Sequence, residues 1–112
     1  SQNYTANSFD ANSLPMYATA ANLTSGFTMN YLGAVLCIPV KFTAATVLKQ
    51  ITLTAVNGEP LGGTFTIGKT SGALNGELSP YSTVSTLYYS FGESGTNFAA
   101  NATVVFYIAI PK

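Results

Sequence analysis

The chain has 112 residues, which is enough for one domain with a core of its own. Its four lysines balance four acidic residues, and charged residues make up only 7% of the sequence, against about a quarter in typical soluble domains. Without arginine or histidine, it lacks the basic patch of a nucleic-acid binder and the residues of most acid–base and metal sites. We therefore expect no nucleic-acid partner, no cofactor, no metal and no enzymatic activity.

The first third of the sequence predicts a polar start followed by two strands. Ser1–Ser13 is rich in Asn and Ser and is expected to be an extended arm or a loose edge strand. Phe27–Leu32 and Ala34–Phe42 are the strand candidates, and Pro39, which has no N–H, is expected to place the second at a sheet edge or a bulge. Cys37 can form no internal disulfide because it is the single cysteine, and we expect it to be buried.

The middle of the sequence reads as a hairpin. Apolar Ile51, Leu53 and Ala55 alternate with threonines, the period-2 pattern of a half-buried strand. Asn57-Gly58 then offers the two residues that tolerate the positive φ angles of a type I′ turn. The strand pattern resumes over Leu61–Ile67, so the two strands are expected to pair with each other.

The last third predicts a turn-rich connection and two further strands. Gly68–Pro80 is expected to be turns, Ser82–Phe91 alternates again, and Gly92–Asn97 is a loop. Thr103–Ile110 is apolar on both faces and is expected to be a central, covered strand. No stretch reaches the roughly 20 apolar residues of a membrane helix, so we expect no transmembrane segment.

These elements predict the fold class. About seven strands at a spacing of roughly 8–12 residues, with no helical period, indicate an all-β, two-sheet β-sandwich. We expect residues 1–112 to form a single β-sandwich domain.

One segment matches a nucleotide-binding motif letter for letter. Gly63–Thr70 fits the phosphate-binding pattern G-x-x-x-x-G-K-[ST]. That chemistry needs a helix whose N-terminal amides cradle the phosphates, whereas the residues after Thr70 read as a turn. We therefore interpret the match as a coincidence of a strand that ends in a Gly-Lys turn.

Three tyrosines form the alternative functional candidate. Tyr81, Tyr88 and Tyr89 are close in sequence, and aromatic rings stack on sugars, so they are candidate glycan contacts. The structural interpretation is that Tyr89 and Phe91 face the core while Tyr88 lies on the outer face of a strand.

The sequence also resembles a known family. Ile51–Ile67 (ITLTAVNGEPLGGTFTI), Val35–Phe42 (VLCIPVKF) and Val104–Pro111 (VVFYIAIP) are similar to the strands of the fimbrillin-like proteins of Bacteroidales, and the segments Leu14–Met16 and Phe27–Asn30 resemble that family's early strands. The resemblance runs from about Leu14 to Pro111. It rests on strands and turns and includes no catalytic signature.

The resemblance implies a Greek-key, transthyretin-like sandwich, the N-terminal domain of a two-domain surface lipoprotein. Such proteins are exported to the cell surface and outer membrane and act as stalk, tip or anchor of a fimbria. In members that assemble, cleavage after an arginine removes an early strand, and a strand from a neighbouring subunit fills the groove. This sequence has no arginine, so such a cleavage site would precede Ser1 or be absent. Because the family usually continues into a second sandwich beyond the position of Lys112, we expect either a domain excised from a larger protein or a minimal member of the family.

Together these observations predict a structural pilus subunit or adhesin that assembles by β-strand complementation. Its partners would be other pilus subunits or copies of itself, with a host or microbial surface as a further ligand. The alternative is a glycan-binding module of a surface uptake lipoprotein. Residues of the two apolar strands are candidates for lining a strand-accepting groove, and they are equally well explained as ordinary core: Leu36, Ile38, Val104, Phe106 and Ile108.

Overall fold

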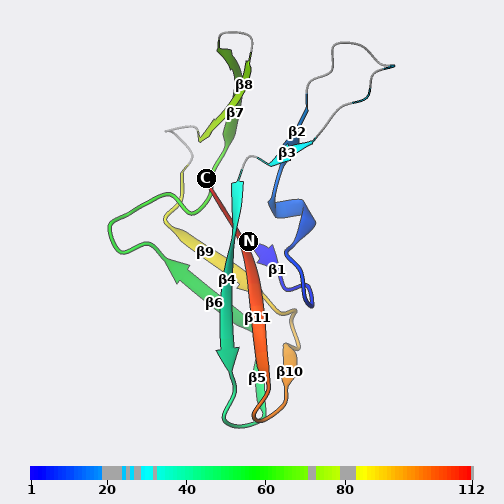
Figure 1. Ribbon diagram of the computed structural model, residues 1–112. Helices are drawn as coiled ribbons and strands as arrows, with labels where there is room; N and C mark the ends of the chain where they lie inside the picture. Colours follow the sequence, from blue (N-terminus) through cyan, green and yellow to red (C-terminus); the bar gives the residue numbers. More distant parts are fainter. Residues whose placement is uncertain are drawn as a thin grey trace.

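The computed structural model describes residues 1–18, 24, 26, 29–31, 33–70, 73–78 and 83–111. In these ranges it contains no α-helix, and its regular structure is a set of strands and one short 3-10 turn (Figure 1). The expected all-β fold is confirmed. In sequence order the elements are β1 (Gln2–Asn3), η1 (Ala11–Ser13), β2 (Met16–Tyr17), β3 (Asn30–Tyr31), β4 (Gly33–Lys41), β5 (Thr46–Leu48), β6 (Gln50–Thr54), β7 (Phe65–Thr70), β8 (Ala73–Leu78), β9 (Thr86–Ser90), β10 (Thr96–Phe98) and β11 (Thr103–Pro111).

The longest pairing joins β4 to β11 in an antiparallel ribbon (Figure 1). Pro39 lies opposite Val105 in this pairing. Further along β11, the backbone N–H and C=O of Ala109 point away from β4, because both form hydrogen bonds with the side chain of Gln2 in β1. Hydrogen bonding alternates along antiparallel strands, so Val105 also turns away from β4 and Pro39 needs no N–H toward β11. The prediction that Pro39 lies in an edge strand is confirmed for the described residues, because among them β11 is the one strand that pairs with β4.

Two predictions about this ribbon are wrong. β11 is not a central strand, since β4 is its one strand partner among the described residues. Cys37 is exposed, not buried. Cys37 lies opposite half-buried Tyr107, on the face of the ribbon that points away from the core. A strand with apolar residues on both faces need not be covered on both faces by other parts of the protein.

The second sheet has the order β1–β9–β6, with β9 in the centre. β6 pairs antiparallel with β9, and β1 runs parallel to β9 along its other edge. Side chains from β9 and β11 face each other across the interior, which gives the sandwich-like packing that the alternation predicted.

The predicted hairpin across Asn57-Gly58 does not form. Gly58 has a positive φ of 79°, but Asn57 does not, so the turn is not type I′. Beyond Pro60 the backbone passes over to Val84, where the N–H of Leu61 donates to the carbonyl of Val84 over 2.7 Å. β6 instead takes the distant β9 as partner, because pairing there buries its apolar face against the aromatic core.

Part of the predicted turn-rich segment is also strand. β7 pairs antiparallel with β8, from Phe65 opposite Leu78 to Thr70 opposite Ala73. The backbone ladder between the two strands overrides the local turn propensity of glycine and asparagine. This hairpin projects from the body of the molecule, as does the short β2–β3 pair, while β5 and β10 close the opposite end (Figure 1).

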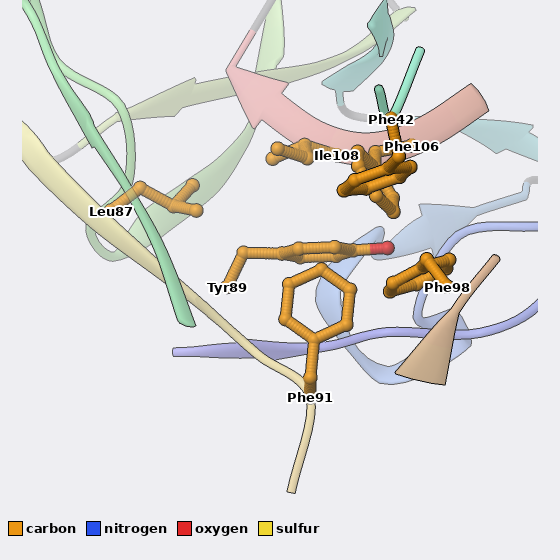
Figure 2. Close-up of a cluster of buried hydrophobic side chains, with 7 residues drawn as sticks. All are labelled: Phe42, Leu87, Tyr89, Phe91, Phe98, Phe106 and Ile108. Carbon is orange, nitrogen blue, oxygen red and sulfur yellow. The ribbon is translucent and has the colours of Figure 1, made fainter. Parts of the chain in front are cut away.

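The core is aromatic. Tyr89 and Phe106 are completely buried, and the stacked rings of Phe42 and Phe98 lie 4.9 Å apart (Figure 2). Tyr4, from the N-terminal segment, adds its ring to this cluster and contacts three of its phenylalanines, Phe91, Phe98 and Phe106, at 5.0–5.8 Å between centroids. Ser1–Ser13 is therefore an edge segment anchored in the core and not a free polar arm. The remaining members of the cluster are Leu87 and Ile108.

Candidate strand-accepting groove

The edge of β9 that faces β1 carries a defined set of backbone groups. The carbonyl of Val84 accepts from the N–H of Leu61, and the carbonyl of Ser90 accepts from the N–H of Tyr4 over 2.8 Å. Toward β6, by contrast, the carbonyl of Ser85 accepts from Ala55. The backbone N–H and C=O groups of successive residues point to opposite edges of a strand, so those of Thr86 point to the same edge as those of Val84 and Ser90.

This edge has a gap in its ladder. At one end, β1 covers the positions of Tyr89 and Ser90. At the other end, Gly62 forms a bridge with Val84. Between these two points, the backbone of Thr86 has no hydrogen-bond partner among the residues that the structure describes. An unpaired strand edge is a template for another extended segment.

A cavity of about 410 Å³ opens beside the gap. Its wall is largely apolar and includes three leucines from separate segments of the sequence, together with the last residues of β11. The residues that give it this character are Leu14, Pro15, Leu61, Leu87, Ile110 and Pro111. We call the cavity and the adjoining edge of Thr86 the β9 groove.

One wall of the β9 groove depends on a close approach at Gly33. A Cβ at this position would lie 2.6 Å from the carbonyl oxygen of Ile110 and 2.9 Å from Cδ1 of Leu14. Glycine is therefore required for Leu14 to lie over the β4–β11 ribbon, where it is only 4% exposed. Without this contact the groove would lose its side wall.

Asp10 ties that wall to β1. Its Oδ2 accepts from the N–H of Asn3 at 2.9 Å, and its Oδ1 accepts from the N–H of Asn12 at 3.0 Å, where Asp10 is the N-cap of η1. The hydrogen bond from the Asn3 backbone lowers the pKa of Asp10 below its ordinary value, and the bond from Asn12 adds to this effect, while burial opposes both.

Gln2 closes the end of the groove with its buried side chain. Nε2 donates to the carbonyl of Ala109 at 2.6 Å, and Oε1 accepts from the N–H of the same residue at 2.9 Å. The side-chain amide thus imitates a strand neighbour for β11 while the backbone of Gln2 pairs with β9. β1 therefore links the edges of both sheets at this end of the groove.

The five candidate groove residues lie elsewhere. Phe106 and Ile108 are completely buried in the core, and Ile38 and Val104 pack against it half-buried. Leu36 is also half-buried, and none of the five lines the cavity. The alternative interpretation, that these residues belong to the ordinary core, fits Phe106 and Ile108. The cavity could not be located from the sequence, because it borders β9, and a strand carries no local sequence signal for an absent neighbour.

The three tyrosines do not form one exposed face. Tyr89 is completely buried, so its ring cannot stack on a sugar, whereas Tyr88 is half exposed and lines the β9 groove. The predicted division between the two neighbours is confirmed, since alternation along β9 places them on opposite faces. Tyr81 lies outside the described residues.

Three further features concern the binding of phosphate, metal ions and membranes. The P-loop-like match continues as strand to Thr70 and is followed by β8, so it has no helix N-terminus to hold a phosphate. Among the described residues no three His, Cys, Asp or Glu side chains gather where they could hold a metal ion. The described ranges also contain no helix of the length and apolarity needed to cross a bilayer.

Comparisons of this sequence with protein-family models, with curated proteins and with solved structures find no match.

Proposed function

We propose that this protein is a structural, non-enzymatic subunit of a surface fibre or adhesin of the fimbrillin-like kind, and that it assembles by accepting a strand from another subunit into the β9 groove. The observation that carries the proposal is the unpaired Thr86 edge beside an apolar cavity. Backbone bonds at such an edge provide affinity, and a pocket for alternate side chains provides specificity. Export to the cell surface belongs to the same proposal.

The energetics of the groove support strand addition. An aliphatic side chain of the incoming strand that becomes fully buried in the cavity contributes about 1.5–3 kcal/mol. Each backbone hydrogen bond to Thr86 adds about 0.5–1.5 kcal/mol. One residue of an incoming strand would thus strengthen binding by roughly two orders of magnitude, and its neighbours along the cavity would add to this.

Exposed apolar side chains of the β2–β3 pair also favour a partner. Met16 and Tyr31 lie opposite each other and are each about half exposed, and the ring of Phe9 packs edge-on against Tyr31. Residues 11–40 include no charged residue, so no like-charge repulsion from this stretch opposes association.

The first experiment is extraction of the protein without boiling from the cells that produce it, followed by SDS gels and negative-stain imaging. Strand-exchanged subunits are expected to give a ladder of SDS-resistant oligomers and filaments. A single monomer band without filaments would exclude a stalk role.

A matched pair of proline variants tests the groove itself. Thr86→Pro removes the N–H that faces the groove, while Thr54→Pro removes its cross-strand counterpart, which faces the opposite edge of the sheet. The ladder should disappear in the first variant and persist in the second. Should Thr86→Pro fail to fold, Leu61→Trp fills the cavity from its own wall and should have the same effect. A ladder that persists in a folded Thr86→Pro or Leu61→Trp variant would contradict the proposal.

A further inference from the structure

In the turn after β6, the two carboxylate oxygens of Glu59 accept two hydrogen bonds from Asn57, an arrangement that we call the Glu59 fork. The backbone N–H of Asn57 donates to Oε2 of Glu59 at 3.1 Å, and Nδ2 of the same asparagine donates to Oε1 at 2.9 Å. The side-chain bond from Asn57 also lowers the pKa of Glu59, so the acceptor is a carboxylate at neutral pH. The whole turn is exposed to solvent.

The residue after Asn57 is Gly58, which has no side chain to hinder the approach of its backbone nitrogen to the Asn57 side chain. Gly58 has a φ of 79°, and a Cβ built there would meet nothing within 4 Å. Its N–H donates to the carbonyl of Ala55 at 3.4 Å, which is beyond the usual range for an N–H···O bond. A glycine in open space can rotate so that its nitrogen approaches the Asn57 Cγ.

That approach has a defined chemical outcome. After a proton leaves the Gly58 nitrogen for a solvent base, the nitrogen bonds to Cγ of Asn57 and the bond between Cγ and Nδ2 breaks. Ammonia leaves, carrying the proton that it takes up from water, and a five-membered succinimide remains. Water then opens the ring at either carbonyl and yields aspartate or isoaspartate, so the net change is asparagine plus water to an acid plus ammonia.

A second Asn-Gly pair in the same protein serves as an internal comparison. Asn75-Gly76 lies inside β8, where Asn75 is paired with Gly68 and Gly76 with Ile67 in the ladder with β7. Ring closure there requires backbone rotations that break ladder bonds, whereas the turn at Asn57 lies outside any strand.

We propose that Asn57 is a site of spontaneous deamidation and that the Glu59 fork restrains it by holding the side-chain amide. The inference is independent of strand addition at the β9 groove. Conversion removes the Nδ2 donor and places a second carboxylate beside Glu59, so the fork is lost. Isoaspartate also lengthens the backbone between Ala55 and Leu61, whose N–H bonds Val84 at the rim of the groove.

The test uses the purified protein held at neutral pH and body temperature for several weeks. Trypsin cuts after Lys49 and Lys69 and so separates Asn57 from Asn75. Mass spectrometry measures the acid form in each peptide, and enzymatic methylation detects isoaspartate. We expect conversion at Asn57 to be several-fold faster than at Asn75, and Glu59→Ala to accelerate it several-fold further.

The control is Glu93→Ala, which removes one exposed carboxylate without touching this turn. It should leave the rate at Asn57 unchanged. Equal or faster conversion at Asn75 would overturn the assignment of the site. An unchanged or slower rate in Glu59→Ala would overturn the restraining role, and acceleration by Glu93→Ala would show that net charge and not the fork sets the rate.

Discussion

The buried amide of Gln2 leads to a prediction with a calculable size. Gln2 is 7% exposed and Ala109 is 3% exposed, so Gln2→Ala leaves an N–H and a C=O of β11 buried without partners. Each unsatisfied group costs about 1–2 kcal/mol here, near the lower end of the usual range because the groove admits some water. The free energy of unfolding should fall by about 2–4 kcal/mol.

That loss is large for a domain of this size. Total stabilities are about 5–15 kcal/mol, and 1 kcal/mol shifts the melting temperature of a domain of this length by about 4 °C. Gln2→Ala should therefore melt about 8–16 °C below the unaltered protein in a thermal scan followed by circular dichroism. The matched control is Gln50→Ala. Gln50 is exposed, and within the described residues its side chain bonds Thr52 alone, so the melting temperature of this variant should hardly change.

Gln2→Glu adds a pH test of the same bond pair. An ionised glutamate places an oxygen where Nε2 faced the carbonyl of Ala109, and a protonated one restores a donor there. The pKa of this glutamate is thus raised in the folded state above about 4.3, its unfolded value. Its stabilising bond is complete below the unfolded pKa and is lost as pH rises through the folded pKa.

Two results would refute this reasoning. The first is a melting temperature of Gln2→Ala within about 2 °C of the unaltered protein, which is the size of change expected for an ordinary surface substitution. The second is a stability difference between Gln2→Glu and the unaltered protein that stays constant across acidic and neutral pH. Either would mean that Gln2 does not hold β11.

Three further changes test the packing around the groove and core. Gly33→Ala should destabilise by about 1–3 kcal/mol in urea titrations, because its Cβ meets the Ile110 carbonyl at 2.6 Å, whereas Gly62→Ala, with a nearest contact of 3.3 Å, should change little. Asp10 has a lowered folded pKa, so its contribution is present above its ordinary value of 3.8 and is lost as pH falls through the folded pKa; Asp10→Asn should flatten the acid limb of a plot of melting temperature against pH. Tyr89→Phe should change stability by less than about 1 kcal/mol in thermal scans, because the buried Tyr89 hydroxyl makes no hydrogen bond of good geometry among the described residues and has only a weak interaction with the Thr5 backbone. A loss above about 1 kcal/mol would contradict this.

Period-2 alternation located several strands closely. The apolar run predicted over 34–42 is β4 (Gly33–Lys41), and the run over 103–110 is β11 (Thr103–Pro111). The opposite faces of Tyr88 and Tyr89 also followed from alternation. These predictions succeed because successive side chains along a strand point to opposite faces, whatever strand lies beside it.

Several predictions that required knowledge of a partner failed. The hairpin at Asn57-Gly58 was inferred from turn propensity, but β6 pairs with β9, and the segment predicted as turns contributes β8. Cys37 was expected to be buried because its surroundings are apolar, yet no described layer covers its face of the ribbon. Burial and pairing depend on what lies across a gap in space, which a local pattern does not contain.

The sequence by itself determined that this protein is an all-β, nearly uncharged domain, because alternation and composition act residue by residue. The tertiary structure alone decided where its open edge lies. The β9 groove combines Gln2, Leu14, Leu61, Thr86 and Ile110, which come from five separate stretches of the sequence. Its gap exists because β1 and the turn after β6 each cover one end of β9 and stop short of each other, and that spacing is set by packing against the aromatic core.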